Sequence, residues 1–146
     1  LREDKPEEAR EAYERAIALD PTHLDSYNNL GMTYRDLDRT ADAIEVFERA
    51  LTLAPESPIV NYNLGHALME IGEVERAQSA LEVFRKTWTD DPILIHYYMG
   101  NVYAESGQIE QARTEYETFL QKWTGDPEIR SSVEKILRSI LGGGSQ

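Results

Sequence analysis

The chain has 146 residues, no cysteine and a formal net charge of −12 at neutral pH. Its length corresponds to one domain of ordinary size, and the lack of cysteine excludes disulfides, thiolate nucleophiles and cysteine metal ligands. Nucleic acids and anionic membrane surfaces attract proteins through Lys and Arg, so this charge disfavours both as partners. We expect no nucleic-acid binding, and a protein or peptide partner that is neutral or basic.

No apolar stretch approaches the roughly 20 residues that a membrane-spanning helix needs. The first residues lack the pattern of a secretory signal. We therefore expect no membrane insertion, and a cytoplasmic location is favoured although the sequence does not determine the compartment. The chain begins with Leu1, so a leader or an upstream domain could have been removed.

The first predicted helix lies within residues 1–21. Pro6 fits a first helical turn, where the missing N–H of proline costs no hydrogen bond, and Pro21 ends the helix. Apolar and small side chains recur on one face at helical spacing. They are Ala9, Ala12, Tyr13, Ala16 and Ile17.

Six further helices are predicted as three pairs. The predicted ranges are 24–37 with 40–53, 58–71 with 74–88, and 93–106 with 109–123. Thr40 or the nearby Asp38 is the expected N-cap of the second helix in the first pair. Gly72 is the expected glycine just after a helix, at the C′ position, where a left-handed backbone is common.

An eighth helix is predicted from residue 127 to residue 141. Its apolar side chains form one stripe and its other face is charged. The stripe consists of Ile129, Val133, Ile136, Leu137, Ile140 and Leu141. This pattern indicates a terminal capping helix with a polar outer side, which stacked repeats need for solubility. Residues 142–146, rich in glycine, are predicted to be a flexible tail.

One stretch of the sequence returns twice. YNNLGMTY at residues 27–34 is followed by NYNLGHAL at 61–68 and HYYMGNVY at 96–103. The glycines within these stretches, Gly31, Gly65 and Gly100, are separated by 34 and 35 residues. A period of this size is typical of stacked helical units. The close crossing of two helices in a unit requires small side chains, which these glycines supply on the first helix. The second helices supply Ala9, Ala43, Ala77 and Ala112.

With these features the chain resembles the tetratricopeptide repeat family. The family's large-Leu-Gly-x-x-Tyr pattern is met by Tyr27, Leu30, Gly31 and Tyr34, and in part by the two later copies. The resemblance implies an all-α fold, a right-handed α-solenoid or superhelix of stacked antiparallel helix pairs with about eight helices. The expected organisation is a single repeat domain over residues 1–141. It comprises a half repeat at 1–23, repeats at 24–57, 58–92 and 93–127, and a capping helix at 128–141.

In this family the first helices of the repeats line a concave groove that binds extended or helical peptides. The resemblance therefore implies a peptide-binding groove lined by all three whole repeats. The candidate residues are Asn28, Asn29, Met32, Arg35, Tyr62, Asn63, His66, Met69, Tyr97 and Asn101.

Three of these candidates are the asparagines Asn29, Asn63 and Asn101. An amide side chain has both a donor and an acceptor, so it can pair with a peptide backbone without reading its sequence. A similar asparagine ladder is found in the repeat superhelix of O-linked N-acetylglucosamine transferases. The alternative is that these asparagines bond within their own helix pairs.

Aromatic and thioether side chains form the second group of candidates. Tyr62, Tyr97, Tyr98, Met32 and Met69 would offer a patch suited to adaptable contact with a peptide. Ordinary packing between repeats is the alternative for these residues.

Nothing in the sequence indicates catalysis, a cofactor or a metal. His66 and Glu70 have the spacing of metal ligands on one helix, but two ligands are too few. The carboxylate clamp with which some family members bind chaperone tails keeps only Asn63 here, so we do not expect that binding. We expect a chain without catalytic residues, bound metal or cofactor.

The leading functional hypothesis is a non-catalytic protein–protein interaction scaffold that binds a peptide segment in the concave groove. One alternative is the substrate-targeting repeat portion of a larger enzyme, such as a glycosyltransferase or a protease. Another is self-association through the first helix, whose partner helix is absent from the sequence. The sequence does not identify the binding partner.

Overall fold

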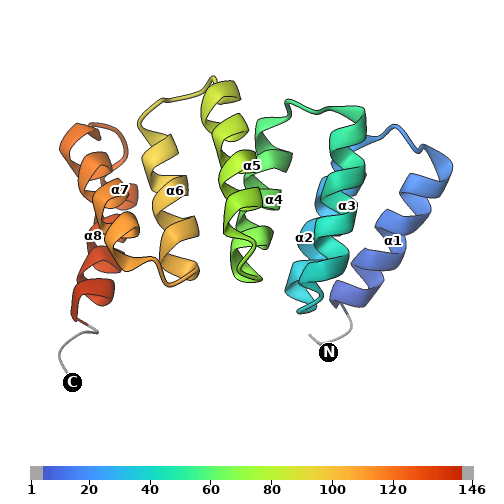
Figure 1. Cartoon of the computed structure of the whole chain (residues 1–146), viewed down its shortest axis with the longest axis horizontal. Helices are drawn as coiled ribbons and strands as arrows, with labels where there is room; N and C mark the ends of the chain where they lie inside the picture. Colours follow the sequence, from blue (N-terminus) through green and yellow to red (C-terminus); the bar gives the residue numbers. More distant parts are fainter. Residues whose placement is uncertain (1–4, 143–146) are drawn as a thin grey trace. The chain divides into compact units, whose positions relative to one another are not determined.

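The structure is a computed structural model, and the residues described are 5–142. Eight helices and no strands are present in this part of the chain (Figure 1). The chain divides into two compact units, one up to Thr87 and one from Trp88 onward, and each is described by itself. The expectation that residues 1–141 form a single repeat domain stays a prediction.

The helices begin and end close to the predicted ranges. The first unit contains α1 (Lys5–Leu19), α2 (Leu24–Asp36), α3 (Thr40–Leu53), α4 (Pro58–Glu70) and α5 (Val74–Thr87). The second unit contains α6 (Leu94–Glu105), α7 (Ile109–Lys122) and α8 (Pro127–Gly142). From α2 onward, each helix end lies within one residue of its prediction. None of these helices has the length and apolar character that crossing a membrane requires.

The turns inside the three helix pairs share one backbone conformation. Gly72 and Gly107 have φ angles of 79° and 77°, and Asp38 has a φ angle of 57° at the corresponding place between α2 and α3. This left-handed conformation suits glycine, and the short side chain of Asp tolerates it better than most others do. The C′ position predicted for Gly72 is therefore confirmed.

The predicted N-cap of α3 is wrong. Thr40 is already the first residue of the helix, and Arg39 occupies the N-cap position without a side-chain capping hydrogen bond. Asp38 forms the left-handed turn one residue earlier, so its side chain is not at the capping position. By contrast, α4 begins with Ser57 as N-cap and Pro58 in the first turn, and the Ser57 hydroxyl accepts a hydrogen bond from the Val60 amide.

The small side chains predicted at the helix crossings lie there. A β-carbon built on Gly31, Gly65 or Gly100 would lie 2.3 to 2.6 Å from a side chain of the second helix in the same pair. The facing side chains are those of Phe47, Leu81 and Tyr116 respectively. The alanines Ala43, Ala77 and Ala112 are all fully buried. Glycine is therefore needed at these crossings because any larger residue would overlap the facing side chain.

In the second unit, α8 covers the core formed by α6 and α7. Tyr116 and Phe119 on α7 and Val133 on α8 are almost completely buried. The Trp123 indole N–H donates to the Asp126 carbonyl at 3.0 Å, and the Trp88 indole makes the same bond to Asp91, 35 residues earlier. The pattern Phe-x3-Trp thus encodes the same turn before α6 and before α8.

The end of α8 differs from the prediction in one residue. Gly142 belongs to the helix, whereas the sequence placed it in the tail. A glycine can extend a helix by one residue at its end, where the lost backbone freedom costs least. The other residues of the predicted tail, 143–146, lie outside the described part of the chain.

Candidate functional site

In the first unit, the candidate residues lie on α2 and α4, the first helices of two successive pairs. The side-chain amide of Asn63 on α4 donates to the Asn28 side-chain oxygen on α2 at 2.8 Å. The Asn28 side-chain nitrogen in turn points to the sulfur of Met32 at 4.0 Å. Thioether sulfur is a weak acceptor, so this second contact is weaker than the hydrogen bond between Asn63 and Asn28.

A charged contact joins the far ends of the same two helices. The Arg35 guanidinium donates to both carboxylate oxygens of Glu70, with the Nε to Oε2 distance at 3.4 Å. The Thr40 hydroxyl also lies 3.3 Å from Glu70. The His66 Nε2 is 3.9 Å from the same carboxylate. Glu70, considered above as a metal ligand, therefore bonds Arg35 and Thr40.

Exposure divides the candidates on α2 and α4 into two groups. Met32 is 45% exposed, while Asn63, His66 and Met69 are 4%, 5% and 5% exposed. Tyr62 is half-buried, and its ring packs against the rings of Phe84 and His66 at centroid distances of 5.2 and 6.1 Å. Met32 is therefore accessible from the solvent, whereas Asn63, His66 and Met69 are enclosed by the protein.

Asn28, Asn29 and Arg35 are each half-buried. The backbone carbonyl of Asn29 accepts a hydrogen bond from the Thr33 hydroxyl at 2.8 Å within α2. This bond lies within α2 and does not involve the side-chain amide of Asn29. The expected pairing of that amide with a peptide backbone stays a prediction.

In the second unit, the asparagine candidate bonds within its own helix pair. The Tyr116 hydroxyl on α7 donates to the Asn101 side-chain oxygen on α6 at 2.7 Å. This is the alternative that the sequence left open for the asparagines. The acceptor of Asn101 is engaged in this bond, while its side-chain nitrogen can still donate.

A pocket lies beside Tyr97 between α6 and α8. Tyr97 packs against Phe119 and Tyr98, with ring centroids 6.0 and 5.4 Å apart. The pocket is lined by Leu94, Tyr97, Tyr98, Asp126, Glu128, Ile129 and Ser132. Apolar and aromatic side chains therefore form its walls, and two carboxylates lie among its lining residues.

Sequence reasoning found the α6 side of this pocket and missed the α8 side. Ile129 lies 35 residues after Leu94, and both follow an Asp-Pro pair at the same spacing. The repeat register therefore contained a signal for Ile129. The signal was overlooked because the last helix, without the glycine of the earlier units, was interpreted only as a cap.

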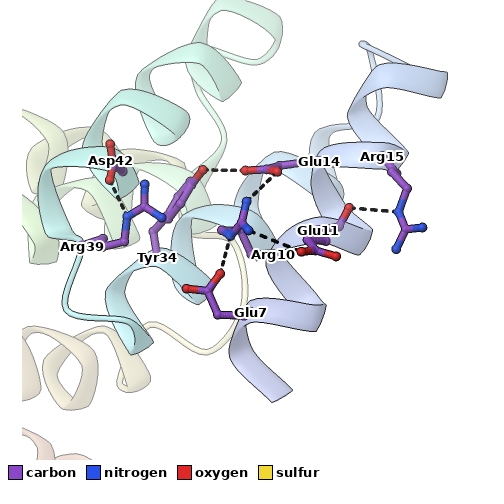
Figure 2. A network of polar contacts seen from close by, with 8 residues as sticks. All are labelled: Glu7, Arg10, Glu11, Glu14, Arg15, Tyr34, Arg39 and Asp42. Carbon is purple, nitrogen blue, oxygen red and sulfur yellow. Dashed lines mark hydrogen bonds and ion pairs between the residues drawn. The ribbon is translucent and has the colours of Figure 1, made fainter. Parts of the chain in front are cut away.

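Polar contacts join α1 to α2, a feature that the sequence did not predict (Figure 2). The Tyr34 hydroxyl on α2 donates to the Glu14 carboxylate on α1 at 2.8 Å, and Arg10 donates to the same carboxylate at 2.8 Å. Partial burial raises the pKa of Glu14, but the hydrogen bonds from Tyr34 and Arg10 lower it by more, leaving it below its ordinary value. Burial and the bond to Glu14 raise the pKa of Tyr34.

His96 makes a further polar contact between paired helices. Its Nδ1 lies 2.7 Å from the Glu115 carboxylate on α7, and the side chain is partly buried. His96 therefore contacts the second helix of its own pair.

Comparisons with known families give a consistent result. Three family models, each described as a tetratricopeptide repeat, match residues 1–58, 34–93 and 96–124. Together these ranges extend from residue 1 to residue 124, with a gap at residues 94 and 95, and they do not include α8.

Two curated proteins are similar over part of the chain. The human protein O-mannosyl-transferase TMTC3 is 30% identical over 94 residues, which make up 64% of this chain and 10% of that protein. Superkiller protein 3 of Saccharomyces cerevisiae is 27% identical over 82 residues, or 56% of this chain and 6% of that protein. The chain thus spans about a tenth or less of the length of these relatives.

Solved structures resemble the chain over most of its length. A crystal structure of MamA matches with a TM-score of 0.62 and 25% identity, covering 91% of this chain and 85% of that one. TTC0263, a thermophilic TPR protein of Thermus thermophilus, matches with a TM-score of 0.70 and 19% identity, covering 88% and 71%. PilW, a type IV pilus biogenesis factor, matches with a TM-score of 0.65 and 21% identity, covering 97% and 72%. These neighbours confirm the predicted class of an all-α solenoid of helix pairs.

Proposed function

Since the chain belongs to the tetratricopeptide repeat family, we propose that it binds a peptide segment of a partner protein against the inner positions of its first helices. The repeats and their structural neighbours support the broader function of a protein-interaction scaffold. This fold is typically a non-catalytic scaffold, and the peptide contact is the specific step proposed here.

The observation that supports the contact most is the orientation of Asn28. Its oxygen is held by the Asn63 amide, which leaves its N–H groups directed toward the sulfur of Met32. A peptide carbonyl is a stronger acceptor than a thioether and would replace it. Because Met32 is long, unbranched and exposed, it can move aside and pack against the guest. Asn28 and Met32 therefore form the proposed contact in the first unit.

The pocket beside Tyr97 supports a preference for partners with basic side chains. Leu94, Tyr97 and Ile129 can cover the aliphatic stem of a Lys or Arg, while Asp126 or Glu128 lies close enough to attract its charge. The net charge of −12 favours the same partners over a longer range. We propose a peptide that is neutral overall or basic.

A display library of random peptides, selected on the intact chain, tests this proposal. We expect peptides that bind at α2 and α4 to bind at least tenfold more weakly to the double variant Asn28→Ala with Met32→Ala. Peptides that bind in the pocket beside Tyr97 should bind at least tenfold more weakly to Tyr97→Ala. Gln111→Ala is the matched control, since Gln111 is an exposed polar residue on the second helix α7. Circular dichroism establishes that each variant keeps its helicity. Equal affinity for all variants would place the contact on another surface.

The similarity to TMTC3 favours a second candidate function. That relative is named as an O-mannosyl-transferase, and the chain matches a tenth of its length. The chain can thus be the repeat portion that brings a protein substrate to a larger enzyme. In that case, deleting the repeats from the longer protein would raise KM for a protein substrate and leave activity on a short acceptor peptide unchanged. An equal loss on both substrates would contradict this function.

A further inference from the structure

A pocket in the first unit is lined by residues of α3, α4 and α5. Its volume is about 330 Å³, and its walls include the aliphatic side chains of Leu64, Leu68 and Val83. Ligand pockets in proteins measure about 300–1,000 Å³, so this one has room for a single side chain or a group of that size. Its polar residue on α4 is Asn61, which lies on the opposite side of that helix from Asn63.

The pocket exists because the second repeat has small side chains at two neighbouring positions. At the position of Asn61 the first and third repeats have Tyr27 and His96, and at the position of Ala80 they have Val46 and Glu115. In the third repeat the two side chains meet, with His96 Nδ1 2.7 Å from the Glu115 carboxylate. Asn61 and Ala80 are the smallest of the three pairs and both line the pocket, so they leave a hollow where the third repeat has a contact.

The side-chain amide of Asn61 brings an unpartnered oxygen to this pocket. Asn61 is 3% exposed, and its nitrogen donates to the carbonyls of Pro55 and Ser57 at 3.0 and 2.9 Å. Both partners are acceptors, which fixes the nitrogen on that side and the oxygen on the other. Among residues 5–142, this oxygen receives no hydrogen bond. Any group that displaces water from the pocket must therefore supply a donor, because a buried acceptor without one is costly.

The charged side chains of the pocket disfavour a charged guest. Glu48 on α3 and Arg76 on α5 both line it, and the Arg76 guanidinium donates to the Glu48 carboxylate. Because this carboxylate is already paired, an entering lysine or arginine would give up its hydration for a neutral amide oxygen. A neutral donor on an apolar body is the better match to the walls and to Asn61.

Tyrosine combines these two properties, since its ring is apolar and its hydroxyl is a donor. The first repeat shows how a tyrosine ring is held in this part of the fold. The guanidinium carbon of Arg49 lies 5.2 Å from the centroid of the Tyr27 ring. Arg76 can offer the same contact to a ring that enters the pocket of the second repeat.

We propose that the pocket between α3, α4 and α5 binds the side chain of a tyrosine in a partner polypeptide. The phenol hydroxyl donates to the Asn61 oxygen, and the ring packs against Leu64, Leu68 and Val83. None of the pocket's lining residues belongs to the contacts at Asn28, Met32 and Tyr97. The two contacts therefore succeed or fail independently.

NMR titration of the intact chain, labelled with nitrogen-15, tests this proposal with two small probes. They are N-acetyl-tyrosine amide and N-acetyl-phenylalanine amide, which differ only in the hydroxyl. We expect the tyrosine probe to shift the backbone amide signals of Leu64, Ala80 and Val83 in a saturable way. It should bind about three- to tenfold more tightly than the phenylalanine probe, because it makes one additional hydrogen bond. Equal binding of the two probes, or shifts confined to other residues, would overturn the proposal.

Two further probes test other occupants. N-acetyl-tryptophan amide has a larger ring with an N–H donor, and p-cresol is the tyrosine side chain without a peptide backbone. We expect neither to bind more tightly than the tyrosine probe. Tighter binding of the tryptophan probe would contradict tyrosine as the occupant. Tighter binding of p-cresol by about tenfold or more would indicate a free phenol instead of a polypeptide.

Ala80→Val and Ala41→Val form a matched pair of variants. Valine is the residue of the first repeat at the position of Ala80, whereas Ala41 is an exposed residue of α3 that does not line the pocket. Filling the pocket with Ala80→Val should weaken binding of the tyrosine probe by about tenfold or more, and Ala41→Val should change it by less than about twofold. Equal binding by both variants would place the probe elsewhere.

Asn61→Leu tests the role of the amide oxygen. This variant keeps an apolar side chain of similar size and lacks the acceptor, so the tyrosine and phenylalanine probes should bind it equally. A preference for tyrosine that survives in Asn61→Leu would remove the Asn61 oxygen from the contact. Circular dichroism establishes that each variant keeps its helicity.

Discussion

Gly31 on α2 lies directly against the ring of Phe47 on α3, so that a β-carbon on Gly31 would be 2.3 Å from a carbon of that ring. Phe47 is fully buried and cannot move away without disturbing its neighbours. The same relationship holds between Gly65 and Leu81 and between Gly100 and Tyr116. These crossings hold the two helices of each repeat together and position the first helices that carry the proposed contacts.

Gly31→Ala is therefore expected to destabilise the fold, although alanine is the better helix former. The propensity gain is about 1 kcal/mol, and overpacking a rigid core costs about 1–3 kcal/mol. With an overlap this severe, we expect a net loss of about 1–2 kcal/mol. Urea unfolding followed by circular dichroism measures it.

Gly142→Ala is the control for this substitution. Gly142 is also helical, but a β-carbon there would meet nothing within 4 Å. The variant should be as stable as the parent chain or slightly more stable. If Gly31→Ala were also as stable as the parent chain, the close contact with Phe47 would not be the reason why position 31 needs glycine.

Asp38→Gly is expected to stabilise the protein. Asp38 has a left-handed backbone with φ at 57°, where the other two repeats have Gly72 and Gly107. Removing the β-carbon relieves this strain, and the greater freedom of glycine in the unfolded chain offsets part of the gain. We expect a rise in unfolding free energy of about 0.5–1 kcal/mol. Gly107→Ala, which adds a β-carbon at the corresponding turn of the third repeat, should lower the free energy of unfolding. A fall for Asp38→Gly or a rise for Gly107→Ala would contradict this account of the turns.

The contact between Tyr34 and Glu14 predicts a dependence of stability on pH. The pKa of Glu14 lies below its ordinary value of 4.5 in the folded chain, so the folded state binds this proton less readily than the unfolded state does. The stabilising contribution is present above pH 4.5 and is lost as the pH falls through the folded-state pKa. Glu14→Gln should therefore be less sensitive than the parent chain to acidification from about pH 6 to about pH 3. Thermal unfolding across this range checks it, and identical pH profiles would rule out this contribution.

The acidic lining of the pocket beside Tyr97 predicts that binding depends on salt. A basic peptide selected on the chain should lose affinity several-fold between low salt and about 0.5 M NaCl, because exposed charges are then screened. Glu128→Gln should weaken binding of this peptide and reduce its sensitivity to salt. Glu45→Gln, an exposed change of the same kind on α3, serves as the control. Equal salt sensitivity in both variants would remove Glu128 from the contact.

The fold was predictable from the sequence because a few residues encode it repeatedly. Gly31, Gly65 and Gly100 recur at a regular interval, and each lies where two helices cross closely. The interpretation of one crossing therefore applies to all three. The turn at Asp38 was misassigned because Asp is common both as an N-cap and in left-handed turns. Only the backbone angle distinguishes these roles.

The candidate site was less predictable than the fold. The repeat register gives the helix face on which a residue lies, but it does not show which neighbouring groups bury or bond its side chain. Met69 and Met32 were assigned to the same surface, yet one is 5% exposed and the other 45%. Likewise, the bond from Tyr116 to Asn101 depends on a side chain of the neighbouring helix. These details arise from packing between helices and are not visible in a single periodic pattern.

The most direct test of the proposed peptide contact is photocrosslinking from two positions on neighbouring helices. A benzophenone amino acid replaces Met32 on α2 in one sample and Glu45 on α3 in the other, and each is irradiated with the selected peptide. Our account predicts that the peptide crosslinks to position 32 and that the product disappears when unlabelled peptide competes. Crosslinking from position 45 with none from position 32 would contradict it.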